Sequence, residues 1–225
     1  MKKNYRYLGT IGTLFVAVLL ISNIASTKIV DFGIFTFDGG TLLFPLSYIF
    51  DDILTEVYGY KKSRTVIWLG FFCIFMMSAI LMIVGALPAA PDWGNQAAYD
   101  AILGLTPRIV LASLLAFTCG NFSNSYILAK MKIWTKGKML WTRTIGSTVV
   151  GELVDSSVFI MIAFFGVLPN SLLFTLIVSN YIFKTLVEVV FTPLTYKVVS
   201  FLKKNENEDY YDNDTNFNPF VLKQD

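Results

Sequence analysis

The sequence predicts an all-α, polytopic membrane protein with six transmembrane helices and both termini in the cytoplasm. Of the 225 residues, 55% are hydrophobic and only 15% are charged, whereas a soluble domain carries about 25% charged residues. The apolar residues form runs long enough to cross a hydrocarbon layer about 30 Å thick. Basic residues gather in alternate connections between these runs. Together these observations place the chain among multi-pass membrane proteins.

Three apolar runs make up the first half of the chain. Residues 7–30 form a run that is too long for the apolar region of a signal peptide, so it predicts the first transmembrane helix. A loop over residues 31–40 leads to the second helix, residues 41–58, which a basic turn at residues 59–64 ends. Residues 65–87 are almost purely apolar and predict a third helix at the lipid boundary.

Three further helices are predicted in the second half. After an interfacial loop over residues 88–106, the fourth helix covers residues 107–131 and opens with a proline, whose missing N–H costs nothing at that position. A basic loop ends at Arg143 and leads to the fifth helix, residues 144–168. A tight turn then connects it to the sixth helix, residues 171–201.

The distribution of basic residues predicts the topology. Because cytoplasmic loops carry an excess of Lys and Arg, the side that holds these residues is expected to be cytoplasmic. The basic residues on this side are Lys2, Lys3, Arg6, Lys61, Lys62, Arg64, those from Lys130 to Arg143, Lys203 and Lys204. We therefore expect residues 1–204 to form one transmembrane domain and residues 205–225 to form an acidic, disordered cytoplasmic tail.

Polar residues lie inside five of the six predicted helices. A carboxyl at membrane depth costs about 2.5–3.5 kcal/mol on insertion scales, so such residues usually have a function. Helical spacing puts Tyr48, Asp52 and Glu56 on one face, and the i, i+3 pair Glu152 and Asp155 on another. The candidate substrate-binding residues are Glu152, Asp155, Asp51, Asp52, Glu56, Asn23, Asn124, Asn180, Lys184 and Tyr48.

Two interpretations of these polar groups are open. They could form a dry network of hydrogen bonds with ion pairs, such as Lys184 with Asp155 or Glu188. The acids outnumber the central lysine, however, which favours a solvated binding cavity. Carboxylates and amides suit a flat heterocycle with several N–H donors, or a cation, and the acids could also carry a driving proton. Rings for stacking would come from Tyr48, Tyr58, Phe159 and Tyr181.

Several kinds of chemistry have no residues to support them. Histidine is absent, and Cys73 and Cys119 sit inside apolar runs without metal-ligand spacing. We therefore expect no catalytic residues, no metal site, no cofactor and no nucleic-acid partner. The expected partners are the lipid bilayer and a small heterocyclic molecule.

Two acidic segments resemble a known family. The first begins with Phe44-Pro45-Leu46 and continues as DDILTEVYG over residues 51–59, and the second follows Arg143 and reads GELVDSSVF over residues 151–159. Asn23 with Lys28, and NYIFK over residues 180–184 with Glu188 and Pro193, fit the same pattern. The chain thus resembles the queuosine precursor transporter family, also called the vitamin uptake transporter family, from the first helix to the sixth.

The resemblance implies a six-helix inner-membrane importer, not an enzyme. Its substrates would be the deazaguanine precursors of queuosine, 7-cyano-7-deazaguanine and 7-aminomethyl-7-deazaguanine, which serve tRNA modification. On this reading Glu152 and Asp155 grip the guanine-like edge, and Asp51, Asp52 and Glu56 come next. The remaining candidates complete the site.

Two other functions fit parts of the sequence. Substrate-binding subunits of energy-coupling-factor vitamin importers are also small six-helix proteins that bind flat heterocycles. The motif Asp51-Asp52-x-x-x-Glu56 resembles the acidic motifs of magnesium-dependent membrane prenyltransferases, but Glu152-x-x-Asp155 is a poor second motif and few basic residues lie nearby.

Overall fold

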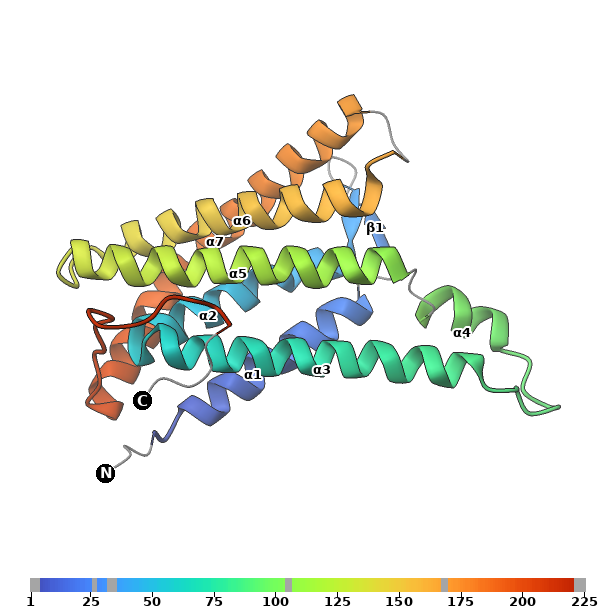
Figure 1. Cartoon of the computed structure of the whole chain (residues 1–225), viewed down its shortest axis with the longest axis horizontal. Helices are drawn as coiled ribbons and strands as arrows, with labels where there is room; N and C mark the ends of the chain where they lie inside the picture. The colour runs from blue at the N-terminus through green and yellow to red at the C-terminus, as the bar shows by residue number, and fades with distance from the viewer. Residues whose placement is uncertain (1–4, 26–27, 32–35, 104–106, 167–169, 221–225) are drawn as a thin grey trace.

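The computed structural model describes residues 5–25, 28–31, 36–103, 107–166 and 170–220. These residues form long helices with one short two-stranded hairpin (Figure 1). The elements are α1 (Leu8–Ala25), β1 (Ile29–Asp31), β2 (Thr36–Asp38), the 3₁₀ helix η1 (Gly39–Leu42), α2 (Phe44–Tyr58), α3 (Tyr60–Ala86), α4 (Gln96–Leu103), α5 (Pro107–Trp134), α6 (Leu140–Phe164) and α7 (Asn170–Glu206).

Within the described residues, four helices are long and apolar enough to cross a membrane, namely α1, α3, α6 and α7. They correspond to the first, third, fifth and sixth predicted spans, and they make the chain a multi-pass membrane protein. The second predicted span forms the helix α2, but its 15 residues extend for only about 22 Å at 1.5 Å per residue. The fourth forms the longer helix α5. The six-span topology therefore remains a prediction.

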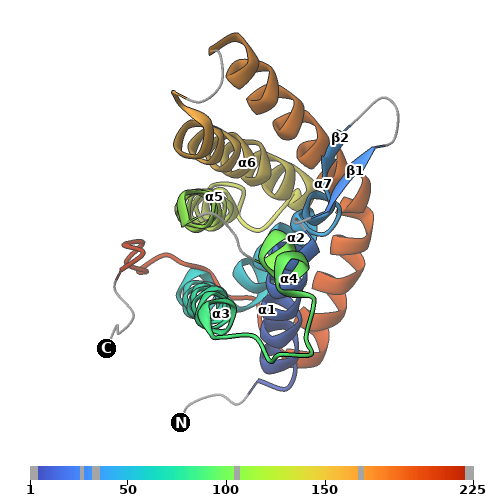
Figure 2. The same ribbon diagram turned by 90° about the vertical axis from the view of Figure 1, so that its right-hand side faces the viewer.

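Helix α2 is the centre of the bundle. It contacts α1, α3, α5 and α7, while α5 packs along α6 and α6 along α7. The end-on view of Figure 2 shows α2 between α1 and α3 on one side and α5 and α6 on the other, with α7 running along the right-hand side. Because helices surround it, every residue from Asp51 to Tyr60 is buried.

The surface of the bundle is apolar and its interior contains charged side chains, which is the reverse of a soluble protein. On α3, Leu69, Phe72 and Ile83 are 55–62% exposed. Inside the bundle, Asp51 and Asp52 are fully buried. An apolar surface around a polar interior suits a helix bundle in lipid, where interior polar groups must satisfy one another or line a cavity.

Several boundaries differ from the prediction, among them the start of α6 at Leu140 and the end of α7 at Glu206. Residues 59–64 belong to α3 except for Gly59, whose φ of 86° lets one residue join two helices because glycine has no Cβ. The first helix ends at Ala25, and Ile29 pairs with Asp38 in the β1–β2 hairpin, since β-branched Ile29 and Val30 favour a strand. The predicted loop at residues 88–106 contains α4.

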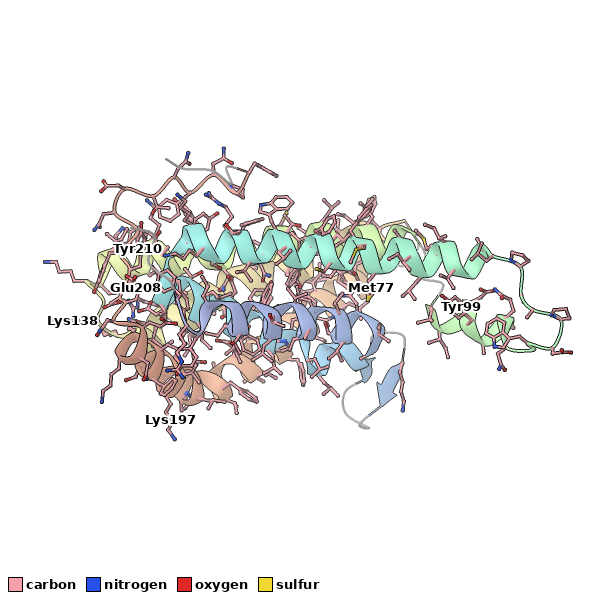
Figure 3. The ribbon with its side chains drawn as sticks, turned by 90° about the horizontal axis from the view of Figure 1, so that it is seen from below. Met77, Tyr99, Lys138, Lys197, Glu208 and Tyr210 are labelled. Atoms are coloured by element: carbon pink, nitrogen blue, oxygen red, sulfur yellow. The ribbon has the colours of Figure 1, made fainter. Side chains whose placement is uncertain are left out.

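The two ends of the described chain meet at one end of the bundle, which we call the tail end. The backbone N–H of Tyr7 donates to Glu206 Oε1 at 2.7 Å, and Tyr5 Oη donates to Glu208 Oε2 at 2.7 Å. The opposite end, beside β1 and β2, is called the hairpin end. Figure 3 shows Lys138, Lys197, Glu208 and Tyr210 at the tail end and Tyr99 of α4 far from them.

Residues 207–220 run along α3 and contact it, while the disorder predicted for residues 205–225 stays a prediction. Arg64 Nη1 donates to the carbonyl of Asn216 at 2.9 Å, and Trp68 Nε1 donates to that of Pro219 at 2.8 Å. Both carboxylate oxygens of Asp212 accept from the N–H of Tyr60, at 3.1 and 3.2 Å. Composition alone suggested disorder because such a tail has few apolar residues, but its backbone carbonyls and acids find partners on α3. Residues 221–225 lie outside the described residues.

Candidate functional site

A cavity lies between the helices in the half of the bundle nearer the hairpin end. Its volume is about 90 Å³, measured as the space open to the centre of a water molecule. This is room for several waters, since one water needs about 10–15 Å³ of such space. The polar side chains that line it are Asn23, Thr41, Ser113, Asp155, Ser156, Asn180 and Lys184. The apolar ones are Phe44, Ile74, Leu114, Ala116, Phe117, Phe159 and Ile160.

Lys184 forms an ion pair with two acids at the wall of this cavity. Its Nζ lies 2.5 Å from Asp155 Oδ2 and 3.2 Å from Glu152 Oε2. Asp155 and Glu152 point the same way because they are three residues apart on α6, and Lys184 faces them from α7. The side chain of Lys184 is only 10% exposed, so two carboxylates and one ammonium share a desolvated space. Their net charge favours a ligand that brings N–H donors or positive charge.

The cavity is rich in hydrogen-bond acceptors. Asn23 Nδ2 donates to the carbonyl of Leu19 at 2.9 Å, and Asn180 Nδ2 to that of Leu176 at 3.0 Å. With its NH₂ group bonded to its own helix, each amide can offer its Oδ1 to a ligand. Ser156 Oγ lines the same cavity and is buried without a partner among the described residues. Buried polar atoms of this kind normally have a partner, which a bound ligand or water would supply.

Aromatic rings form the apolar part of the wall. Phe44 and Phe117 lie edge to face with their centroids 5.1 Å apart. Lys184 Nζ stands 4.7 Å from the centre of the Phe44 ring, a cation–π contact. A planar ligand can therefore stack on a ring while its edge reaches the Asp155–Lys184 pair.

A second polar group lies deeper in the bundle and outside the cavity. Asn124 Nδ2 donates to Asp52 Oδ1 at 2.6 Å and to Asp51 Oδ2 at 3.3 Å. Ser125 Oγ lies 2.6 and 2.7 Å from the two oxygens of Asp51, and Ser63 Oγ also donates to Asp51. These contacts join α2 to α5 and α3.

A third group closes the tail end of the bundle around Glu56. Its Oε1 accepts from Lys203 Nζ at 2.6 Å and from Arg143 Nη2 at 2.9 Å, and Lys132 Nζ lies 3.6 Å away. Asp209 from the tail binds Lys132 and Lys203 at 2.6 and 2.8 Å. Burial alone would raise the pKa of Asp209, but hydrogen bonds from Lys132 and Lys203 hold that pKa below its ordinary value.

The predicted residues thus divide among three places. The cavity is lined by Asn23, Asp155, Asn180 and Lys184. Glu152 is not part of its lining but forms an ion pair with Lys184. Asp51, Asp52 and Asn124 belong to the deeper group, and Glu56 belongs to the tail-end group. Tyr48 is buried between α2 and α5, where its hydroxyl has no partner among the described residues. The expected ring Tyr58 lies far from the cavity and donates to Glu206 at 3.1 Å.

Sequence reasoning missed two sets of residues. The cavity residues Phe44, Phe117 and Ser156 were not predicted, although Ser156 is one turn from Glu152 and next to Asp155. Arg143, Lys132 and Lys203 were interpreted only as topogenic charges, because helical spacing cannot show which acid a basic residue from another helix will meet.

The chain is similar to one protein family and to two named proteins. Residues 38–198 match the family described as "Putative vitamin uptake transporter". A protein of Bacillus subtilis strain 168 named "Probable queuosine precursor transporter" is 28% identical over 206 residues, which are 90% of each chain. A Haemophilus influenzae protein with the same name is 23% identical over 129 residues, 56% of this chain and 51% of that protein. No solved structure matches this chain.

Proposed function

Because this chain belongs to the vitamin uptake transporter family, we propose that it imports the deazaguanine precursors of queuosine across the cell inner membrane. The substrates are 7-cyano-7-deazaguanine, 7-aminomethyl-7-deazaguanine or both. The names of the two relatives support this substrate class. Import serves the salvage of these precursors for tRNA modification.

The observation that carries this proposal is the Asp155–Lys184 pair in an aromatic-walled cavity. The guanine edge of both precursors presents N–H donors next to a carbonyl oxygen. A carboxylate accepts two parallel hydrogen bonds from such donors, and the neighbouring ammonium can donate to the carbonyl. Asp155 would take the donors, Lys184 the carbonyl, and Phe44 or Phe159 the face of the ring. Asp51, Asp52 and Asn124 lie outside the cavity, so we assign no substrate contact to them.

The proposed topology has six spans with both termini in the cytoplasm. It is supported by the contact between Tyr7 and Glu206, which brings the two ends of the chain together. The tail end also carries the basic residues Lys138 and Lys197 (Figure 3), as cytoplasmic ends do. The cavity then lies in the half away from the cytoplasm, and the ion pairs of Glu56 close the cytoplasmic side. This arrangement suits an importer that is ready to receive substrate from outside.

Uptake in living cells tests this function. Cells that cannot make queuosine precursors are supplied with one precursor at a time, and queuosine in their tRNA is measured with and without this chain. We expect the modified nucleoside only when the chain is present. Asp155→Asn should lower uptake at least tenfold, since a hydrogen bond to a charged group contributes about 1.5–3 kcal/mol and 1.4 kcal/mol is tenfold.

Asp92→Asn is the matched control, because Asp92 is an exposed acid in the connection after α3. It should leave uptake unchanged. Equal queuosine in cells without the chain would reject the function, and full uptake by Asp155→Asn would reject the assigned role of that residue. Uptake by the purified chain alone in vesicles would also separate it from an importer that needs a nucleotide-hydrolysing partner.

A further inference from the structure

The buried acids of the bundle are not all neutralised. Lys184 forms ion pairs with Asp155 and Glu152, and the cations around Glu56 form ion pairs with that residue. Three more acids are 0–1% exposed, and none of them has an ion pair among the described residues. These are Asp51, Asp52 and Glu188. An ionised carboxylate without a cation is costly in such a place.

Hydrogen bonds satisfy only one of these three acids. Both oxygens of Asp51 accept from Ser125, and Ser63 adds a further donor. Asp52 has a partner for Oδ1 alone, and Asp52 Oδ2 and both oxygens of Glu188 have none in the described part of the chain. Asp52 and Glu188 come from the contacting helices α2 and α7, and the charge of Glu188 acts on Asp52.

A neutral side chain marks the same region independently. Asn121 is fully buried, and neither its Oδ1 nor its Nδ2 has a partner in the residues that the structure covers. It lies one turn before Asn124 and Ser125 on α5, so it shares their face, which contacts Asp51 and Asp52. Buried amides rarely lack partners. Asn121 is therefore a second polar group without a partner in the described residues, on the face of α5 that contacts Asp51 and Asp52.

The charged surroundings add further negative charge. Asp51 and Glu56 act on Asp52 from its own helix, and Glu152 of α6 acts on Glu188. The hydroxyl of Tyr48 on α2 interacts electrostatically with Asp51 and Asp52, and that of Tyr60 on α3 interacts with Asp51. Lys184, one turn before Glu188, is already paired with Asp155 and Glu152. Two ionised carboxylates in a low dielectric repel one another, and they are stabilised when one of them holds a proton.

We propose that Asp52 and Glu188 form a proton-binding site that couples import to the proton gradient. The proposal rests on the proposed function and adds its energy source. A proton from the outer water binds a carboxylate oxygen as the substrate binds, and the same proton leaves that oxygen for cytoplasmic water when the tail end opens. No group of three or more acids, cysteines or histidines converges on a metal-sized point among the described residues. The ligand that we assign to Asp52 and Glu188 is a proton, because protonation removes the cost of a buried carboxylate that has no cation.

Transport by the purified full-length chain in lipid vesicles tests this site. Labelled 7-cyano-7-deazaguanine, which carries no amine to be protonated, is offered with and without a gradient of one pH unit, acid outside, while the membrane potential is held at zero. One proton per substrate allows about tenfold accumulation from this gradient, since one pH unit is 1.36 kcal/mol. Exchange of labelled for unlabelled substrate is measured in parallel, because exchange needs no net movement of protons.

The matched variants are Glu188→Gln, which removes the titratable group, and Glu188→Asp, which keeps it. We expect Glu188→Gln to reduce gradient-driven accumulation from about tenfold to none while exchange stays within about twofold of wild type. Glu188→Asp should keep part of the accumulation, and Asp92→Asn all of it. Gradient-driven accumulation that persists in Glu188→Gln would overturn the site.

A dye that reports pH inside the vesicles gives a second readout on the wild-type chain, which does not depend on the folding of a variant. Substrate added without a gradient should acidify the interior. Exchange without any acidification would overturn proton coupling and leave the proposed function standing. Absence of both exchange and uptake for either precursor would instead reject the proposed function.

Discussion

At the scale of single residues, Lys184 makes the acids of the cavity compatible with burial. It lies within 3.2 Å of both Glu152 and Asp155. Removing one acid leaves a balanced pair of one cation and one anion. Removing the lysine leaves two carboxylates with no cation, and breaking a buried ion pair in this way costs about 3–5 kcal/mol.

Lys184→Met should therefore destabilise the protein far more than Asp155→Asn, although both should abolish uptake. The melting temperature of each purified variant in detergent measures the stability, and uptake in cells measures the function. Equal stability of the two variants would show that Lys184 is not needed to neutralise these acids.

At the scale of elements, α5 and α6 approach one another closely at two glycines. Gly120 and Gly151 face one another there, and the Tyr48 hydroxyl of α2 lies against Gly120. A Cβ on Gly151 would lie 2.9 Å from Asn124 Cβ and 3.1 Å from both Gly120 O and Tyr48 Cε1. Such distances are too short, so the two helices can approach only because both residues are glycine.

Gly151→Ala should destabilise the bundle by about 1–3 kcal/mol, the usual cost of overpacking a well-packed interior. At about 2–4 °C for each kcal/mol in a chain of this length, the melting temperature should fall by several degrees. Gly9→Ala is the control, since a Cβ there meets nothing within 4 Å. An unchanged melting temperature for Gly151→Ala would mean that α5 and α6 lie further apart.

At the scale of the whole molecule, the tail end of the bundle is held together by ion pairs. The tail end contains the ion pairs of Glu56 and the tail itself, which Asp209 fastens to Lys132 and Lys203. The tail begins after the matched family region ends at residue 198. The closed tail end is thus partly built by residues outside that region.

Asp209→Asn should loosen the tail at every pH at which the carboxylate of the wild-type chain is ionised. Because the folded state holds the pKa of Asp209 below its ordinary value, the carboxylate stabilises the folded chain above its unfolded pKa of about 3.9, and this contribution is lost only as the pH falls further. Wild type should therefore resist proteolysis of the tail better than the variant at pH 7 and at pH 5.

The expected difference is modest, about 1 kcal/mol or less, since the Asp209 side chain is 45% exposed and exposed ion pairs are weak. Asp214→Asn, an exposed acid of the same tail, is the control. A difference between wild type and Asp209→Asn that disappears between pH 7 and pH 5 would contradict the lowered pKa.

Much of this protein could be predicted from local patterns. The helical membrane architecture, the acidic signatures and the family follow from runs of apolar residues and short motifs. The strands at residues 29–31 and 36–38 and the course of the tail could not be predicted, because both depend on partners elsewhere in the chain. The same limit explains why Arg143 and Lys203 were interpreted only as topogenic charges.

The amino-acid sequence by itself determined that this chain is a multi-pass membrane protein with costly acids inside its helices, since hydrophobicity and helical spacing are properties of neighbouring residues. Only the tertiary structure decided what each acid does. It placed Asp155 beside Lys184 at the cavity and Glu56 among the cations of the tail end, whereas Asp52 and Glu188 have no cation among the residues that the structure describes. Pairing depends on the relative depth and rotation of helices, and these are set by packing across the whole bundle.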